Sequence, residues 1–274
     1  MQSFIKNKLN ETNYFALDHE LEQLTAIQQL FAETFTFENL DVFLQNDETI
    51  DEQFLIDKLL VHERGGLCYE INGALYLVLR ELGFDVTLGS ATVWSDPENR
   101  WIIDRTHTII LFYKNEQMYL LDSGSGTNVA IKPLQLDGEP VQSPVGIFRL
   151  RTEDTDRGSI VSEKLTEDGW VLRYAFHPVE VDFHEDINRI KQLIHTHPES
   201  PFNKDLLIAR TFSDGTVSIN SNRSSRKWIN ADGFVEKEER VEFETIHDTL
   251  KAVQQYGSPS TYATAQRYVN QKGR

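Results

Sequence analysis

The spacing of apolar residues changes from a helical to a strand-like period near residue 84. In residues 17–34, part of 51–63 and 68–82, apolar side chains recur every three or four positions, which places them on one face of a helix. Gly83 follows the last of these patterns, and glycine is common just after the end of a helix. The first 83 residues therefore predict a mainly helical segment.

Beyond residue 84 the pattern is that of short strands, rich in β-branched and aromatic residues and separated by polar turns. Such runs occur in residues 85–94, 106–113, 118–122, 146–152 and 169–181. A helical pattern in residues 184–197 then leads to a hairpin candidate that turns at Asp214 and Gly215, and to a last helix in residues 244–257. The order predicts an α+β multi-domain fold with helices in residues 1–83, an antiparallel β segment in 84–183, a connecting helix in 184–200 and a smaller α/β segment in 201–274.

The charge balance limits the partners of this chain. Its formal net charge is -16, from 43 acidic and 27 basic residues, which opposes non-specific binding to nucleic acid or anionic lipid. No apolar run is long enough to span a membrane, and the first residues lack the apolar core of a signal peptide. With one cysteine the chain forms no internal disulfide. We expect a cytoplasmic protein with no nucleic-acid or membrane partner, and the sequence does not indicate an oligomeric state.

Cys68, the single cysteine, lies where a helix is predicted to begin, directly after the segment RGGL. A lone free cysteine is more often a small buried hydrophobe than a nucleophile. Here the two glycines predict a turn whose backbone can approach a ligand closely, and the free N–H groups of a helix N-terminus favour a thiolate. The local sequence therefore makes Cys68 a candidate nucleophile.

His107 and Asp122 are candidate partners for this thiol. If residues 106–124 form a hairpin that turns within residues 114–117 and pairs Tyr113 with Met118, Asp122 shares a face with His107 as its diagonal neighbour. A three-residue turn would place the two on opposite faces. Under the first register Asp122 orients His107 and His107 takes the thiol proton, which is a Cys-His-Asp arrangement for nucleophilic catalysis.

The glycine-rich segment DSGSG, residues 122–126, is a weaker signal. It lacks the Walker spacing and is more often a turn, but beside the three candidate residues its amides could hold part of a phosphorylated substrate. His195 and His197 have no ligand pattern beside them, so we expect no metal site.

These motifs resemble the arylamine N-acetyltransferase family. The resemblance rests on RGGLCYEIN (residues 64–72), FTFENLD (35–41), THTIIL (106–111), LLDSGSG (120–126) and SPFNKDLLIARTFSDGTVSI (200–219), which occur in family order and span most of the chain. It implies an N-terminal helical bundle, a central antiparallel β-barrel and a C-terminal α/β lid around a cysteine-protease-like catalytic core. It also implies Cys68 as nucleophile, His107 as general base and Asp122 as orienting carboxylate.

The activity that the resemblance implies is acetyl transfer in two steps. Acetyl-CoA acylates the thiol and CoA leaves, and then a small aromatic amine, hydrazine or hydroxylamine takes the acetyl group; acetyl-CoA is a co-substrate, and no permanently bound cofactor is expected. The backbone N–H groups of Cys68 and Thr106 are candidate oxyanion donors. Three motif residues are expected to support the triad, with a buried ion pair and a helix cap as their structural alternative: Glu38, Arg64 and Asn72.

The loop after Asp122 departs from the family pattern. Gly124, Ser125 and Gly126 are expected to line the cleft for CoA and the acceptor, but Ser123 and Ser125 replace a valine and a phenylalanine that are usual there. We expect Ser125 to widen the cleft by removing a stacking surface for an aryl group, and its hydroxyl to require water or a ligand.

Three other functions share the same residues. Papain-like or transglutaminase-like cysteine hydrolases have the chain order Cys, His, Asp, and an amide synthase uses a carrier-bound acyl chain in place of acetyl-CoA. The altered loop also leaves a catalytically silent homologue as an alternative.

Overall fold

Helices occupy most of the first third of the chain, as the apolar spacing predicts. The computed structural model describes residues 1–272. The predicted helices are α2 (Glu20–Thr34), α4 (Glu52–Leu55) continued by the π-helical turn η2 (Ile56–Val61), and α5 (Cys68–Glu81). Three further helical pieces were not predicted: α1 (Gln2–Asn10), η1 (Tyr14–Ala16) and α3 (Leu40–Phe43).

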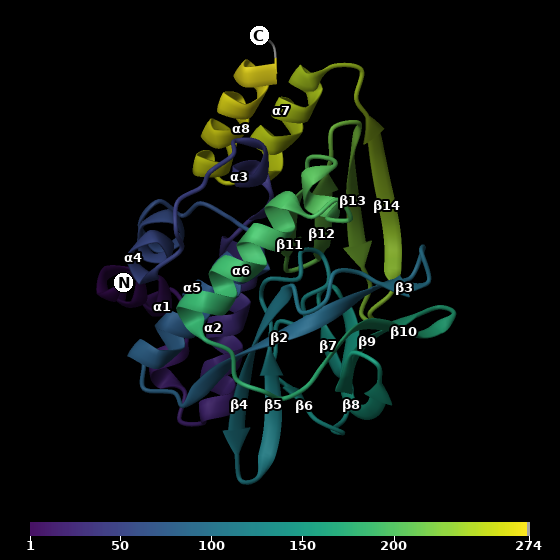
Figure 1. Cartoon of the computed structure of the whole chain (residues 1–274). Helices are drawn as coiled ribbons and strands as arrows, with labels where there is room; N and C mark the ends of the chain where they lie inside the picture. Colours follow the sequence, from purple (N-terminus) through teal and green to yellow (C-terminus); the bar gives the residue numbers. More distant parts are fainter. Residues whose placement is uncertain (273–274) are drawn as a thin grey trace.

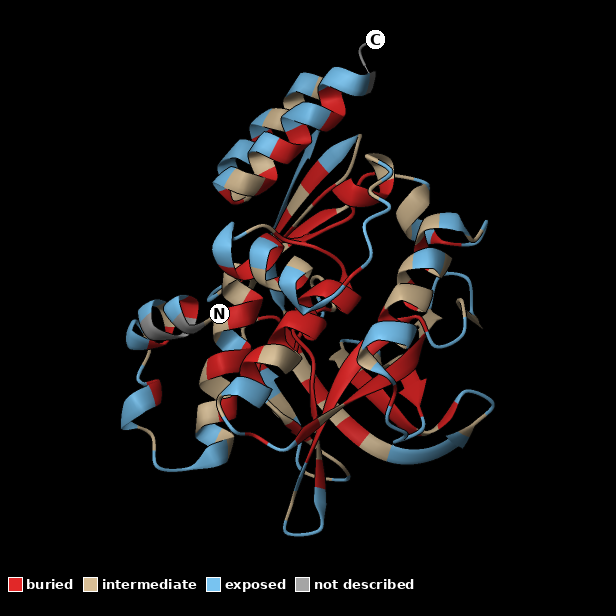
Figure 2. Cartoon of the chain, turned by 60° about the vertical axis from the view of Figure 1, so that its left-hand side comes forward, coloured by how far each residue is buried: buried red, intermediate tan, exposed pale blue. Residues whose placement is uncertain are grey.

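The helix α5 lies at the centre of this part of the molecule. All eight residues of its first two turns, 68–75, are buried, and the surrounding core draws side chains from α2, α6 and the strands behind them. Gly83 ends the helix with a φ of 89°, and the N–H groups of Gly83 and Phe84 bond the carbonyls of Arg80 and Leu79. This is the Schellman arrangement that the glycine predicted. Figure 2 shows buried residues concentrated where the helices meet the sheet.

The middle of the chain forms an antiparallel sheet that curves into a nearly closed barrel (Figure 1). Its strand order is β6-β5-β4-β2-β10-β9-β8-β7, with β3 paired to β2, and a parallel bridge between Leu136 and Leu150 connects the β6 end to β8. The strands are β2 (Val86–Ser95), β3 (Arg100–Trp101), β4 (His107–Lys114), β5 (Gln117–Leu121), β6 (Leu134–Gln135), β7 (Val141–Ser143), β8 (Gly146–Thr155), β9 (Gly158–Thr166) and β10 (Gly169–Phe176).

The β4–β5 hairpin has the predicted register. Tyr113 pairs with Met118, and the two-residue turn at 115–116 has positive φ at both positions, 50° and 64°, as a type I′ turn requires. Continued past the last pair of the ladder, this register places Asp122 diagonally across from His107 on the same face. The hairpin therefore brings together two residues that are 15 apart in the sequence.

The last third of the chain forms the lid. The connecting helix α6 (Phe183–Thr196) and the turn η3 (Pro201–Asn203) lead into a sheet of order β1-β11-β12-β13-β14 with two helices packed on it. The elements of the lid are β1 (Phe37–Glu38), β11 (Ile208–Phe212), β12 (Gly215–Ile219), β13 (Arg223–Ile229), β14 (Val235–Glu242), α7 (Ile246–Tyr256) and α8 (Pro259–Lys272). The predicted hairpin is β11–β12, but its turn residues are Ser213 and Asp214, because Gly215 already pairs with Phe212.

The strand β1 joins the helical segment to the lid. It belongs to the first 83 residues, yet it pairs antiparallel with β11, and it lies directly before the loop that leads to α3. The division of the chain at residues 83, 183 and 200 stays a prediction. Within residues 1–272, none of the helices combines the length and apolarity needed to cross a membrane.

Candidate active site

Cys68 is the first residue of α5 and is buried, with 3% of its surface exposed. The Glu70 carboxylate accepts a hydrogen bond of 2.9 Å from the N–H of Leu67 and so caps the helix at the residue before the thiol. The Cys68 thiol lies 3.6 Å from the carbonyl oxygen of Thr106, its hydrogen-bond acceptor. The helix N-terminus thus fixes the thiol against the start of β4.

The two glycines before Cys68 do not approach a ligand, so that interpretation was wrong. A Cβ on Gly65 would lie 1.8 Å from the carbonyl oxygen of Thr36, and one on Gly66 would lie 2.5 Å from the Glu70 carboxylate. Gly66 also exchanges backbone hydrogen bonds with the chain at Thr36 and Glu38. Their small size lets β1 and the cap of α5 approach the loop that leads to the thiol.

A buried ion network holds the same loop. Arg64 pairs with Glu38 at 3.1 Å and with Asp41 at 2.7 Å, and Lys58 pairs with Asp41 at 2.7 Å and with Glu70. Burial alone would raise the pKa of the Asp41 carboxyl, but Lys58 and Arg64 hold that pKa well below its usual range. The predicted supporting residues Glu38 and Arg64 therefore act by fixing the approach to α5. Sequence reasoning missed Lys58 and Asp41, whereas Glu70 had a signal, because it stands three residues after the helix cap.

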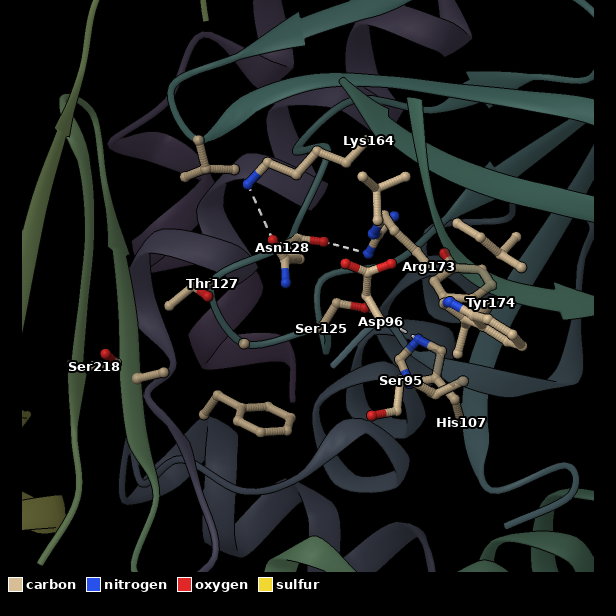
Figure 3. Close-up of a pocket in the computed structure, with 18 of the residues that line it drawn as sticks. Ser95, Asp96, His107, Ser125, Thr127, Asn128, Lys164, Arg173, Tyr174 and Ser218 are labelled. Carbon is tan, nitrogen blue, oxygen red and sulfur yellow. Dashed lines mark hydrogen bonds between the residues drawn. The ribbon is translucent and has the colours of Figure 1, made fainter. Parts of the chain in front are cut away.

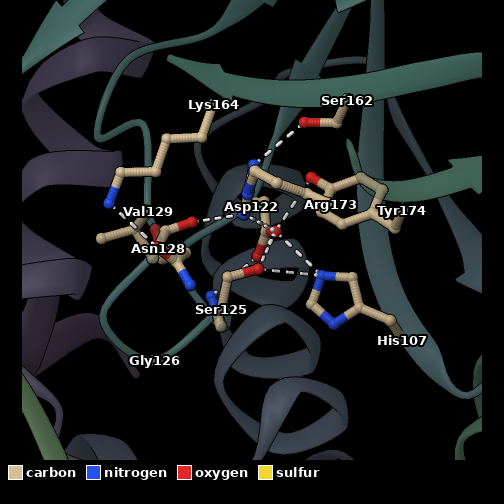
Figure 4. A network of polar contacts seen from close by, with 12 residues as sticks. His107, Asp122, Ser125, Gly126, Asn128, Val129, Ser162, Lys164, Arg173 and Tyr174 are labelled. Carbon is tan, nitrogen blue, oxygen red and sulfur yellow. Dashed lines mark hydrogen bonds and ion pairs between the residues drawn. The ribbon is translucent and has the colours of Figure 1, made fainter. Parts of the chain in front are cut away.

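His107 is held by Asp122 as the hairpin register predicted. The distance from His107 Nε2 to Asp122 Oδ2 is 2.8 Å, and both side chains are buried. Since Nε2 is engaged in this contact (Figure 4), Nδ1 is the nitrogen that remains for the thiol. Burial would lower the pKa of His107, but the Asp122 carboxylate and then Cys68 raise it to about 10.

Asn72 ties the other oxygen of Asp122 to the helix α5. Its side-chain nitrogen donates to Asp122 Oδ1 at 2.9 Å and to the carbonyl oxygen of Thr108 at 2.7 Å, while its oxygen accepts from the N–H of Ser123 at 2.9 Å. One amide thus joins α5, β4 and the loop after β5. This geometry is what a supporting residue for the triad requires.

Two residues that sequence reasoning missed reach the same carboxylate from β10. The hydroxyl of Tyr174 donates to Asp122 Oδ2 at 3.0 Å, and the guanidinium of Arg173 lies 3.9 Å from that oxygen. Both neighbours point the same way because the register shifts between Leu172 and Tyr174, which makes Arg173 the extra residue of a β-bulge. The sequence has no feature that predicts this bulge, so the contact of these two residues with Asp122 could not be predicted.

The hydroxyl of Ser125 does not need water or a ligand, so that expectation was wrong. It lies 2.5 Å from Asp122 Oδ2 and 3.1 Å from His107 Nε2, within reach of both (Figure 4). The expected anion-binding role of the loop amides is also limited, because the N–H groups of Ser123 and Gly124 bond Asn72 and Asp122. These polar groups of the loop therefore hydrogen-bond to the triad and to Asn72 and hold them in place.

Gly124 allows the loop to lie against the helix of the nucleophile. A Cβ at this position would lie 2.8 Å from the Cα of Cys68 and 3.0 Å from the side-chain nitrogen of Asn72. With Ser125 and Gly126 it lines a cavity of about 910 Å³ that also contacts Cys68 and His107 and extends to the lid sheet (Figure 3). Within residues 1–272 no group of three or more His, Cys, Asp or Glu side chains could hold a metal ion.

A buried thiol at a helix N-terminus, with an imidazole and a carboxylate from an adjacent barrel, defines an enzyme of the cysteine-nucleophile class. Residues 20–255 match the family model described as N-acetyltransferase, and the chain belongs to the arylamine N-acetyltransferase family of acyltransferases.

Similarity to relatives extends along nearly the whole chain. The uncharacterized acetyltransferase YvcN of Bacillus subtilis is 35% identical over 246 residues, which are 86% of this chain and 96% of that protein. An arylamine N-acetyltransferase of Bacillus cereus, described as having a unique Cys-His-Glu catalytic triad, has a TM-score of 0.80 and 31% identity over 94% of this chain and 99% of its own. The Mycobacterium marinum enzyme in complex with CoA has a TM-score of 0.77 and 25% identity, covering 97% and 98%.

The raised pKa of His107 predicts a loss of stability at alkaline pH. The ordinary pKa of histidine is about 6.5, so below that pH the unfolded and folded states both hold the proton and the contribution is complete. Between about 6.5 and about 10 only the folded state keeps it, and the free energy of unfolding is expected to fall as pH rises through this window. Urea titrations of the native chain and of His107→Gln from pH 6 to 10.5 measure this, and the difference between the two curves removes the titrating groups that do not interact with His107. A difference that stays constant or grows with pH would contradict the assignment.

Proposed function

We propose that this chain transfers an acetyl group from acetyl-CoA to arylamines, arylhydrazines or hydroxylamines through an acetyl-Cys68 intermediate. The observation that carries the proposal is the 2.8 Å contact of His107 with Asp122 beside the buried thiol, at the wall of a cavity large enough for the acyl end of CoA and an aromatic ring. The family relative crystallised with CoA supports CoA as the acyl carrier. A chain with one cysteine and a thiolate-dependent reaction suits a reducing compartment, and we place it in the cytoplasm.

In the first step the Cys68 thiolate attacks the thioester carbon of acetyl-CoA. A new C–S bond forms to Cys68, the bond to the CoA sulfur breaks, and the imidazolium of His107 gives its proton to the departing CoA thiolate. The backbone N–H groups of Cys68 and Thr106 stabilise the oxyanion of the tetrahedral intermediate. Asp122 keeps His107 charged until the leaving group needs the proton.

In the second step the amine takes the place that CoA has left. Its nitrogen attacks the acetyl-Cys68 carbonyl, the C–S bond breaks, and His107 accepts the proton that the nitrogen loses as the amide forms. The thiolate and imidazolium are then restored. Because the two substrates use one cavity in turn, the kinetics are expected to follow a ping-pong cycle.

Replacement of the nucleophile tests the covalent intermediate. Cys68→Ala is expected to abolish transfer, and Cys68→Ser to retain almost none, because a serine hydroxyl is far harder to ionise. With the native chain, initial rates for varied acetyl-CoA and 4-anisidine should give parallel double-reciprocal lines, and intact-protein mass spectra should show one acetyl adduct that disappears when the amine is added. Intersecting lines together with activity in Cys68→Ala would contradict the proposal. A stable chain that acquires no adduct would favour a silent homologue, and hydrolysis of the adduct faster than transfer would favour a hydrolase.

Ser125 is proposed to position the triad as well as to shape the acceptor end of the cavity. Removing its hydroxyl in Ser125→Ala takes one donor from Asp122, so we expect single-turnover acetylation of Cys68 to slow by up to about tenfold, the worth of one charge-assisted hydrogen bond. Ser125→Phe should slow acetylation in the same way and lower KM for small arylamines by adding a stacking surface. Stopped-flow acetylation and steady-state KM separate the two effects. The control is Ser95→Ala, a cavity serine without a bond to the triad. Unchanged acetylation in both Ser125 variants would refute the positioning role.

A further inference from the structure

Three basic side chains converge on one end of the cavity. Lys164 comes from β9, Arg173 from the bulge of β10 and Lys227 from β13 of the lid, and all three line the cavity that contains the triad. Lys164 Nζ donates to the Asn128 side chain at 3.0 Å, and Arg173 donates to the Asn128 carbonyl, so the two cations lie on opposite sides of one residue (Figure 3). Acidic residues outnumber basic ones in this chain, which has a net charge of -16, so its composition alone does not explain three basic side chains in one cavity.

The charges of this cluster are poorly neutralised by the part of the chain that the structure describes. No carboxylate lies within 4 Å of Lys164 there. The only carboxylate within 4 Å of Arg173 is that of Asp122, and it already accepts five shorter hydrogen bonds, one of them from His107. Lys227 lies 3.9 Å from Glu238, at the limit of an ion pair. Burial, and to a smaller extent the positive charges of Arg173 and Lys227, lower the pKa of Lys164 to about 8. At neutral pH the ammonium therefore stays charged without a counter-ion.

Donors remain free for a ligand. The hydrogen bonds of Arg173 to Ser162 and Asn128 use two of the five N–H groups of its guanidinium, and Lys164 uses one of three. Both cations also flank the buried ring of Phe148, at 5.0 and 5.4 Å from its centroid, which excludes water from one side. Three carboxylates, Asp96, Glu167 and Asp168, line the same cavity, but they are exposed to solvent and none is within 4 Å of these cations.

The position of the cluster decides which part of a substrate it meets. Arg173 lies 3.9 Å from the carboxylate that orients His107, so an anion bound there is a neighbour of the reacting atoms. The phosphates of CoA are separated from its thioester by the whole pantetheine arm, and they cannot lie beside the triad while the thioester carbon is at Cys68. The anion must therefore belong to one of the two small groups that meet at the thiol.

We infer that Lys164 and Arg173, with Lys227 from the lid, bind a carboxylate carried by the amine acceptor or by the transferred acyl group. The inference rests on the proposed acyl transfer through Cys68 and names its substrate class. A planar carboxylate matches the fork of a guanidinium, and the nearby ammonium adds a second charge-assisted hydrogen bond. The rest of the cavity wall is largely apolar, with Val93, Ile102 and Leu172 available to contact the ring or chain that carries the carboxylate.

The acceptor arm of the test compares 4-aminobenzoate with 4-aminobenzamide, which has the same shape without the charge. The acyl arm compares malonyl-CoA with isovaleryl-CoA, again a charged and a neutral group of one shape, by the rate at which each adduct appears on Cys68. In at least one arm we expect the charged substrate to have a kcat/KM or acylation rate about tenfold above that of its neutral partner. In Lys164→Met this ratio should fall toward one, because only Arg173 and Lys227 remain to bind the charge. Lys132→Met, a lysine exposed on the barrel and outside the cavity, should keep it.

Each outcome decides the inference. Ratios near one in both arms for the native chain overturn it, as does a ratio that Lys164→Met leaves intact. An equal loss for malonyl-CoA and isovaleryl-CoA in Lys164→Met also overturns it, because the cations would then bind the CoA phosphates. If Lys164→Met melts below the native chain, Lys164→Gln and Lys227→Met provide the same comparison. Acetylation of Cys68 by acetyl-CoA is recorded in parallel: its absence refutes the proposed function, whereas acetylation without a charge preference refutes only this inference.

Discussion

Asp122 is a carboxylate that the fold removes from water, and a buried charge is stable only when donors replace its hydration. Five hydrogen bonds do so. The side chain of Asn72 and the N–H of Gly124 donate to one oxygen, and three side chains donate to the other: His107, Ser125 and Tyr174. The charge of His107 and its hydrogen bond, followed by the charge of Arg173 and the hydrogen bond of Asn72, outweigh the cost of burial and hold the pKa of Asp122 well below its usual range. The donors come from α5, β4, β10 and the loop after β5, so this one carboxylate joins the helical part to the barrel.

A second buried electrostatic system lies on the other side of Cys68. The network of Arg64, Lys58 and their three carboxylates holds the loop before α5, while the Asp122 cluster holds the hairpin that faces it. Breaking a buried network of this kind by removing one partner typically costs about 3–5 kcal/mol, because the charge left behind has no water. The thiol thus lies between two rigid frames. The proposed reaction requires such rigidity, because in it one imidazole gives a proton to CoA and later takes one from an amine.

Much of the site could be predicted because its parts are local in sequence. A helix start follows from the apolar stripe after Cys68, and a two-residue turn with an even register places Asp122 on the face of His107. The missing parts are tertiary. Arg173 and Tyr174 reach the site through a bulge in β10, and Lys58 reaches it from a π-helical turn. Neither irregularity can be predicted from a single sequence.

Gly65 and Gly66 were recognised as special for the wrong reason, since the close neighbour is the chain at Thr36 rather than a ligand. The strand β9 and the helix α8 were missed because their many charged and polar residues make the spacing of their apolar residues hard to recognise.

The central claim is that Asp122 makes Cys68 reactive by keeping His107 charged and oriented. The most direct test measures single-turnover acetylation of Cys68 by acetyl-CoA in Asp122→Asn, with Asp137→Asn, an exposed aspartate of the barrel, as the matched control. Near-ultraviolet circular dichroism establishes that both variants are folded. The account predicts a rate about 10³–10⁴-fold below native for Asp122→Asn, comparable to the loss in a serine triad, and a native rate for the control. A folded Asp122→Asn chain that acetylates Cys68 at a near-native rate would contradict it.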